Sequence, residues 1–132
     1  MQLSKNFTQK EFNSKDGSTM PDEVLRNIEL LSEQLQIIRD YTGKSITINS
    51  GYRSPEHNRS IGGAYKIVNG KRKETSQHVF GKAADIVIDG MKPADTYALI
   101  EYLNDKGVIK IGGLGHYNTF THVDIREGKA RW

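Results

Sequence analysis

The most regular hydrophobic pattern in the chain lies between Pro21 and Gly43. Apolar side chains recur there at spacings of three and four residues, at Val24, Ile28, Leu31, Leu35 and Ile38. This is the periodicity of one face of an α-helix, which Pro21 suits as a first-turn residue and Gly43 as a stop. We therefore expect an amphipathic helix here, with its apolar stripe in the core.

The rest of the chain shows shorter helical and extended patterns. Strands are predicted over 45–50, 84–89, 108–111 and 120–125, and further helices over 8–13, 55–61 and 93–106. Residues 64–75 are polar and contain the turn signal Asn69-Gly70, so we expect an excursion or a hairpin, and the glycines of 112–115 indicate a tight turn. Helices before and between short strands favour one α+β domain over 1–132, with a small, mostly antiparallel sheet.

Composition narrows the possible chemistry. The 132 residues include no cysteine, which excludes a disulfide framework, a thiol nucleophile and a cysteine-ligated zinc finger. A metal held by histidine and carboxylate remains open, and four histidines are available. The net charge of +3 is small and spread along the chain, without a basic helix, so we expect no nucleic-acid partner.

The sequence also bears on where the protein acts. The opening MQLSKNFTQKEF contains no apolar secretory core, and no stretch reaches the roughly 18 apolar residues of a membrane span. We therefore expect no contact with a membrane. If the protein acts on a cell wall, we expect phage lysis machinery, another export route or a signal already removed to bring it there.

Two histidines lie near carboxylates. His78 precedes Asp85 in SQHVFGKAAD, and His122 precedes Asp124 in HVDIR. A catalytic zinc takes three protein ligands and keeps one position open. We expect His78 in the loop before one predicted strand, Asp85 at the start of that strand and His122 on another, so that a shared metal would join the two strands. Each spacing taken alone fits ordinary polar strand residues equally well. Asp124 shares the strand face of His122, so it is a candidate general base or a group that orients the imidazole.

Three further polar residues are candidates for the chemistry. Arg53 in SGYRS suits a clamp on a substrate carboxylate or an oxyanion, although a surface role fits as well. Ser76 is either a hydrogen-bond donor to a ligand or substrate, or the cap of a turn. His116 is either an acid–base group or a solvated turn residue, and His57 is given no role.

Three ordered segments together resemble a known family. SGYRSPEHN, SQHVFGKAADI and GGLGHYNTFTHVDIR resemble the metallopeptidase family M15, above all its D-alanyl-D-alanine carboxypeptidase branch and the related phage cell-wall hydrolases. The resemblance covers about residues 45–126, and the opening LSKNFTQKEF and the terminal Arg131-Trp132 also match it. It implies the small α+β fold shared with the zinc-bearing hedgehog domain. It also implies peptidoglycan stem peptides as substrate, cleaved at an amide bond that involves D-amino acids.

The resemblance further implies one zinc ion per chain, bound by His78, Asp85 and His122, with Arg53 binding substrate or stabilising the transition state. The sequence departs from the family in one respect. Several members place an acidic residue three positions before the last ligand, where this chain has Thr119. We therefore expect Asp124, or failing that His116, to act as general base. A non-catalytic, zinc-bearing module that binds cell wall or protein is the alternative function, and we expect a monomer in either case.

Overall fold

A five-stranded sheet forms the centre of the computed structural model, which describes residues 1–132. Its strands follow the order β3-β6-β8-β7-β9, and all neighbours are antiparallel except β7 and β9. The strands are β3 (Ile46–Ser50), β6 (Ala83–Ile88), β7 (Gly113–His116), β8 (Thr121–Asp124) and β9 (Ala130–Arg131). The predicted α+β class and the mostly antiparallel sheet are confirmed.

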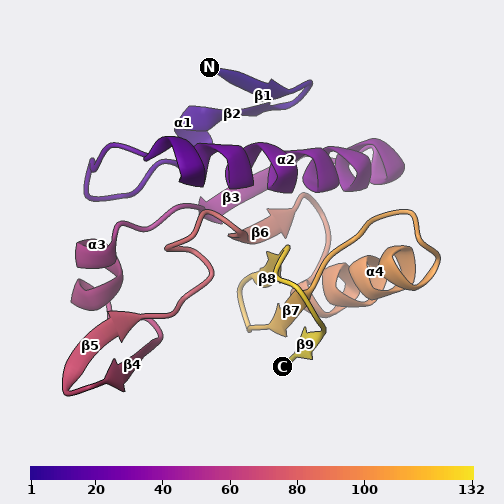
Figure 1. Ribbon diagram of the computed structural model, residues 1–132. Helices are drawn as coiled ribbons and strands as arrows, with labels where there is room; N and C mark the ends of the chain where they lie inside the picture. Colours follow the sequence, from indigo (N-terminus) through magenta and orange to yellow (C-terminus); the bar gives the residue numbers. More distant parts are fainter.

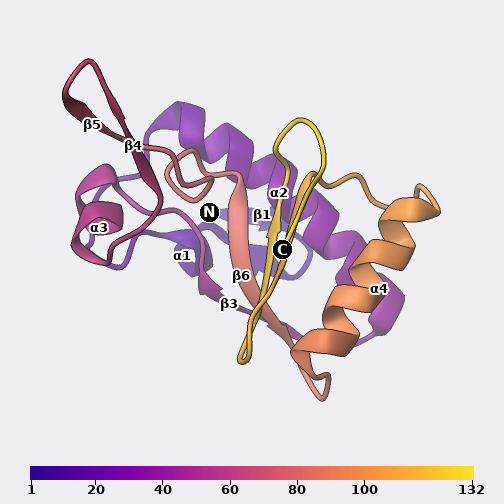
Figure 2. The ribbon, with the colours of Figure 1, turned by 90° about the horizontal axis from the view of Figure 1, so that it is seen from below.

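Four helices accompany the sheet. They are α1 (Gln9–Phe12), α2 (Asp22–Thr42), α3 (Pro55–Ser60) and α4 (Pro93–Asp105). The long helix α2 covers one face of the sheet (Figure 1), and it ends where Gly43 takes a left-handed conformation with φ of 65°. Seen from below, the strands lie in front of α2 and α4 runs alongside β7 (Figure 2). No helix is both long and apolar enough to span a bilayer.

Alternation along the strands separates the core from the opposite face of the sheet. Ile86 of β6 and Val123 of β8 belong to the hydrophobic core that α2 and α4 complete. Asp85 on β6, and His122 and Asp124 on β8, lie on the other face, where Asp85 is paired directly with His122. The sheet therefore brings two distant segments of sequence together at one point.

Two small hairpins stand outside the central sheet. The first joins β1 (Gln2–Ser4) to β2 (Phe7–Thr8), which no sequence pattern predicted. The second joins β4 (Tyr65–Val68) to β5 (Lys71–Glu74) through the turn at Asn69-Gly70, where both residues have positive φ. The hairpin interpretation of residues 64–75 is therefore confirmed, and this hairpin projects from the body of the molecule (Figure 1).

One predicted strand is wrong. Residues 108–111 are irregular, β7 begins at Gly113, and the connection to β8 falls at 117–120 rather than at 112–115. The glycines here serve close packing, because a Cβ on Gly113 would overlap the carboxylate of Asp124. A glycine-rich strand lacks the side chains by which strands are recognised, so it resembled a turn.

Candidate metal centre

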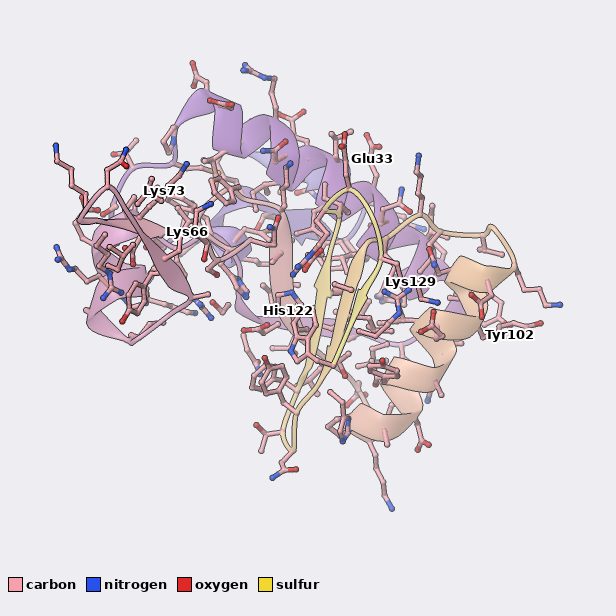
Figure 3. All side chains as sticks on the ribbon, turned by 60° about the horizontal axis from the view of Figure 1, so that its bottom comes forward. Glu33, Lys66, Lys73, Tyr102, His122 and Lys129 are labelled. Carbon is pink, nitrogen blue, oxygen red and sulfur yellow. The ribbon has the colours of Figure 1, made fainter.

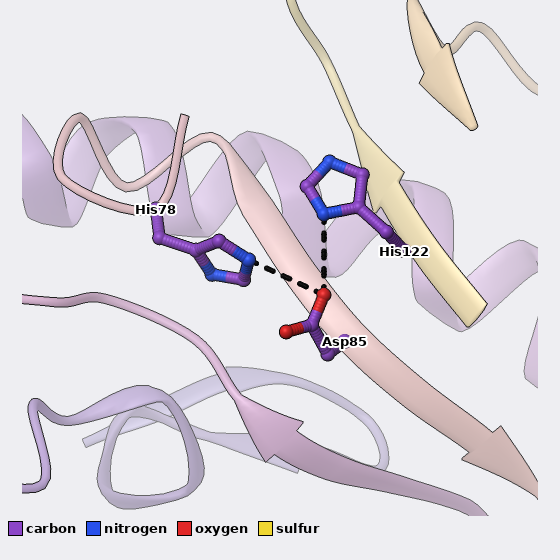
Figure 4. Close-up of side chains that lie close together, drawn as sticks. All are labelled: His78, Asp85 and His122. Atoms are coloured by element: carbon purple, nitrogen blue, oxygen red, sulfur yellow. Dashed lines mark hydrogen bonds and ion pairs between the residues drawn. The ribbon is translucent and has the colours of Figure 1, made fainter. Parts of the chain in front are cut away.

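Three polar side chains converge on the face of the sheet that is turned away from α2. His78 lies in the loop before β6, Asp85 lies on β6 and His122 lies on β8 (Figure 4). They are buried, with 3%, 6% and 6% of their surface exposed, and their ligand atoms all lie within 4.8 Å of one another. Asp85 Oδ1 is 3.2 Å from His78 Nε2 and 3.1 Å from His122 Nδ1.

In each of the two histidines, the ring nitrogen that faces away from Asp85 contacts a hydrogen-bond acceptor. His78 Nδ1 lies 2.7 Å from the Gly51 carbonyl, which only accepts, so this nitrogen carries the proton and Nε2 is free to bind a metal. His122 Nε2 lies 2.7 Å from Asp124 Oδ2 and donates to it when Nδ1 binds a metal. Two unprotonated nitrogens and one carboxylate oxygen then face a single point. This donor set fits a zinc ion that keeps one position open.

Asp124 is a fully buried carboxylate with many donors around it. It accepts hydrogen bonds from the Gly113 amide at 2.8 Å and from the Arg126 guanidinium at 2.7–3.1 Å, besides His122. Burial alone would raise the pKa of Asp124, but the hydrogen bonds from His122 and Arg126 outweigh it and hold that pKa well below its usual range. Asp124 is therefore ionised, and it contacts the ring of His122 on the side away from Asp85.

Arg53 lies beside the cluster and is largely buried. Its guanidinium donates three long hydrogen bonds of 3.3–3.4 Å, to Ser50, Asn58 and Asp85. Burial lowers the pKa of Arg53 and the charge of Asp85 partly restores it, but a guanidinium stays protonated at neutral pH. Arg53 therefore presents a positive charge next to the three candidate ligands.

The cluster opens into a cavity of about 470 Å³ with two unlike sides. Polar residues of the segment before β6 line it, including Ser76, whose Oγ also accepts from the His78 amide at 3.3 Å and so caps the turn. The other side is aromatic, formed by Tyr117, Phe120 and Trp132. Trp132 packs on His122 with ring centroids 4.9 Å apart, and its Nε1 donates to the Tyr117 hydroxyl at 2.8 Å.

The other two histidines lie apart from the cluster. His116 is exposed on β7, on the same face as Leu114, and its ring meets Tyr97 of α4 edge-on with centroids 6.3 Å apart. The structure does not bring His116 to the cavity. His57 lies on α3 and donates its backbone N–H to Ser54 at the start of that helix.

Sequence reasoning gave no role to Asn58, Arg126 or Tyr117, which contact the candidate site. Asn58 lies within SGYRSPEHN and Arg126 ends GGLGHYNTFTHVDIR, each two residues or more from any residue singled out. The signal that identifies Asn58 is the burial of its polar side chain, that of Arg126 is its contact with a buried charge, and that of Tyr117 is its place in the cavity wall. None of these properties is visible before the fold is known.

The close approach of Gly115 and Trp132 gives a first prediction. A Cβ on Gly115 would lie 2.5–2.8 Å from atoms of the Trp132 ring. We expect Gly115→Ala to displace that ring and to lower the free energy of unfolding by about 1–3 kcal/mol. Because Trp132 is the only tryptophan, its fluorescence spectrum and a urea titration measure both effects. In a Trp132→Ala background, Gly115→Ala should hardly change the free energy of unfolding. A decrease as large as in the wild-type background would contradict the packing argument.

The pKa of His122 gives a second prediction. Burial disfavours the charged ring, but hydrogen bonds with Asp124 and Asp85 outweigh it and raise the pKa of His122 above the usual 6.5. Zinc binds neutral imidazole, so we expect zinc affinity to fall about tenfold per pH unit once the pH drops through that raised pKa. The stability of the metal-free fold changes with pH in the opposite direction. Protonated His122 stabilises that fold below pH 6.5, and the contribution is lost as the pH rises through the raised pKa.

Chelator competition across acid and neutral pH measures the zinc affinity, and urea titrations of metal-free protein measure the fold. A zinc affinity that stays constant across this range would contradict the assignment of His122 as a ligand.

Fold and site together define an α+β protein with a buried cluster of two histidines and one aspartate that opens to a cavity. Comparison with known proteins places it: a family model for Peptidase M15 matches residues 5–124, so the chain belongs to that peptidase family. It is also 30% identical to the zinc D-Ala-D-Ala carboxypeptidase of Streptomyces albus G. That alignment covers 94% of this chain and 47% of the relative, so the chain spans about half of the relative's length.

Proposed function

We propose that this protein is a zinc-dependent peptidase that hydrolyses amide bonds in peptidoglycan stem peptides, as a D,D-carboxypeptidase or an endopeptidase. One observation carries the proposal: the ligand atoms of His78, Asp85 and His122 converge within 4.8 Å of one another beside an open cavity. Membership of the Peptidase M15 family supports hydrolysis of peptide bonds. The name of the Streptomyces relative supports zinc and D-alanine-containing substrates.

Each residue of the site then has a definite task. A zinc ion bound here would supply Lewis-acid chemistry, by acidifying water toward a pKa of about 7 and polarising a carbonyl group. The Gly51 carbonyl and the Asp124 carboxylate hold protons on the outer nitrogens of His78 and His122, so the inner nitrogens keep their lone pairs. Arg53 offers its N–H groups to a substrate carboxylate or to the developing oxyanion.

The sequence leaves two candidates, Asp124 and His116, for the group that accepts the proton of the attacking water, and the geometry bears on both. Asp124 has no surface exposed, and its Oδ2 already accepts from both His122 and Arg126. His116 lies on the face of the sheet that carries Leu114. We therefore propose that Asp124 acts through His122, by fixing its ring, rather than by touching the water.

A variant of Asp124 tests this role. We expect Asp124→Asn to weaken zinc binding about 10–100-fold, because an amide lacks the charge of Asp124, and an amide oxygen that accepts from His122 leaves the amide nitrogen facing the N–H donors of Gly113 and Arg126. At saturating zinc, kcat should stay within a few fold of wild type. Zinc titration and steady-state kinetics at matched zinc content separate these quantities. A turnover rate that falls by about two orders of magnitude or more at full zinc occupancy would instead make Asp124 the general base.

A second candidate function is favoured by one observation. Asp85 is the only carboxylate among the residues that line the cavity, so no free acid stands ready for proton transfer. This fits a module that binds cell wall through a zinc-bearing site without cleaving it. Purified peptidoglycan distinguishes the two functions: a peptidase releases peptide or amino acid, stops when zinc is chelated and resumes when zinc is restored. A binding module sediments with the wall material and releases nothing.

A further inference from the structure

A chain of polar side chains connects the projecting β4–β5 hairpin to the candidate metal centre. Asn58, on α3, is completely buried. Its Oδ1 accepts from the Arg53 guanidinium at 3.3 Å, and its Nδ2 donates to the Ala64 carbonyl at 3.2 Å and to Glu74 Oε1 at 3.1 Å. Arg53 in turn contacts Asp85 at 3.4 Å. In Figure 3 the hairpin, marked by Lys66 and Lys73, lies to one side of His122.

The orientation of the Asn58 amide is fixed by these partners. Both groups around Nδ2, the Ala64 carbonyl and the Glu74 carboxylate, only accept hydrogen bonds. Arg53 only donates, so the amide oxygen must face it. A flipped amide would oppose donor to donor and acceptor to acceptor. The three contacts therefore act as one arrangement rather than as three independent bonds.

The hairpin side of this arrangement is itself held in place. Glu74 accepts two hydrogen bonds from Arg72, at 2.8 and 3.1 Å, and the Arg72 guanidinium lies 3.8 Å from the centre of the Tyr65 ring. Gly63 donates its amide to the Asn58 carbonyl at 2.8 Å, and a Cβ there would overlap the Asn58 side chain. The base of the hairpin thus closes over Asn58 and leaves its oxygen directed at Arg53.

The arginine at the other end is loosely anchored. All three hydrogen bonds that its side chain donates are long, at 3.3–3.4 Å, and Asp85 is one of the acceptors. Without the Asn58 oxygen, the guanidinium keeps only Ser50 and Asp85, a candidate ligand that should point at the metal. Asn58 therefore counteracts the collapse of Arg53 onto Asp85.

We propose that Asn58 is a positioning residue for Arg53: it holds the guanidinium toward the cavity, and Glu74 of the hairpin fixes the Asn58 amide for this task. The inference rests on the proposed function, in which Arg53 contacts the substrate. It assigns the β4–β5 hairpin a part in the site although none of its exposed side chains reaches the metal cluster. A displacement of a reacting group by about 1 Å costs on the order of a hundredfold in rate, so the effect is measurable.

A double-mutant cycle with Arg53 tests the proposal. We expect Asn58→Ala to lower kcat/KM about 10–100-fold with zinc content unchanged. In an Arg53→Ala background the same change should have almost no further effect, because Asn58 acts only through Arg53. Losses that multiply in the double variant, or a kcat/KM within twofold of wild type for Asn58→Ala, would overturn the proposal. Ser60→Ala, on the same helix, provides a folding control with unchanged activity.

Two further measurements keep the test decisive. If Asn58→Ala fails to fold, Glu74→Ala replaces it, since this change removes the acceptor that orients the Asn58 amide, together with the acceptor of Arg72, and leaves the Asn58 and Arg53 side chains in place. We expect Glu74→Ala to lower kcat/KM by less than Asn58→Ala does, and to have almost no further effect in an Arg53→Ala background. A decrease of the same size in that background would contradict the proposal. The Arg53 Nε–H resonance, assigned with Arg53→Lys, gives a readout that needs no activity. We expect it to be resolved in wild type and averaged in Asn58→Ala, and an unchanged resonance would refute the positioning role even if wild type proves to be no peptidase.

Discussion

Replacing His122 by alanine should abolish both tight zinc binding and peptide cleavage. The side chain contributes one of three ligand atoms, and its loss leaves the buried carboxylates of Asp85 and Asp124 without the ring that lies between them. Removal of the metal chemistry should cost several kcal/mol of transition-state stabilisation, which corresponds to a rate loss on the order of 10³-fold or more. Zinc stoichiometry by elemental analysis and cleavage rates on the same sample measure the two losses together.

The chain offers a matched control for this experiment. His116 is also a histidine near the β7–β8 connection, but it is exposed and packs against Tyr97 of α4. His116→Ala should keep full zinc content and a cleavage rate close to wild type. If His116→Ala loses activity while retaining zinc, His116 reaches the substrate, and the general base would have to be assigned to it. If His122→Ala retains full zinc, the proposed ligand set is incorrect.

The second large effect is expected at Arg53. Arg53→Ala should slow turnover about 10²–10³-fold, because it removes a cationic group that lies next to the cluster and makes only long hydrogen bonds. The guanidinium of Arg126, by contrast, is already paired with Asp124 through short hydrogen bonds. Zinc content should stay normal, since Arg53 contacts only the outer oxygen of Asp85. Steady-state kinetics at matched zinc content provide the measurement.

Two variants sharpen the interpretation of Arg53. Arg53→Lys should recover only part of the lost rate, because an ammonium group cannot reproduce the planar fork of a guanidinium. Arg59→Ala, which removes an exposed arginine from α3, should leave the rate unchanged. A rate for Arg53→Ala within threefold of wild type would show that substrate binding and oxyanion stabilisation depend on other groups.

The sequence predicted those parts of the fold in which local pattern and tertiary structure agree. The stripe from Val24 to Ile38 lies on α2 and packs into the core, and the strands over 45–50 and 84–89 lie within a residue or two of their observed bounds. Residues 112–115 illustrate the opposite case. Only glycine fits there, because a Cβ on Gly113 would overlap Asp124 and one on Gly115 would overlap Trp132. Both neighbours come from later in the chain, so the local glycine pattern predicts a turn where the structure has a strand.

The candidate site was predictable only in part, for a related reason. Residue type and spacing make His78, Asp85 and His122 candidates, and the resemblance implies that they form one ligand set, because spacing alone does not show that β6 and β8 pair with Asp85 opposite His122. The groups that hold the candidate ligands and Arg53 in place were not predictable, because their roles depend on tertiary contacts. The Gly51 carbonyl behind His78 and the Asn58 oxygen beside Arg53 are two examples. Their importance lies in burial and direction, which follow from the assembled sheet and hairpin.

The central claim is that His78, Asp85 and His122 hold a zinc ion that makes this protein a peptidase of cell-wall peptides. Digestion of defined peptidoglycan stem peptides by zinc-loaded protein, with the products weighed by mass spectrometry, tests it most directly. We expect a zinc-dependent product, shortened by a terminal D-alanine or cut at an internal bond next to a D-amino acid, and no product from His122→Ala. Fully zinc-loaded wild-type protein that leaves every stem peptide intact would contradict the claim.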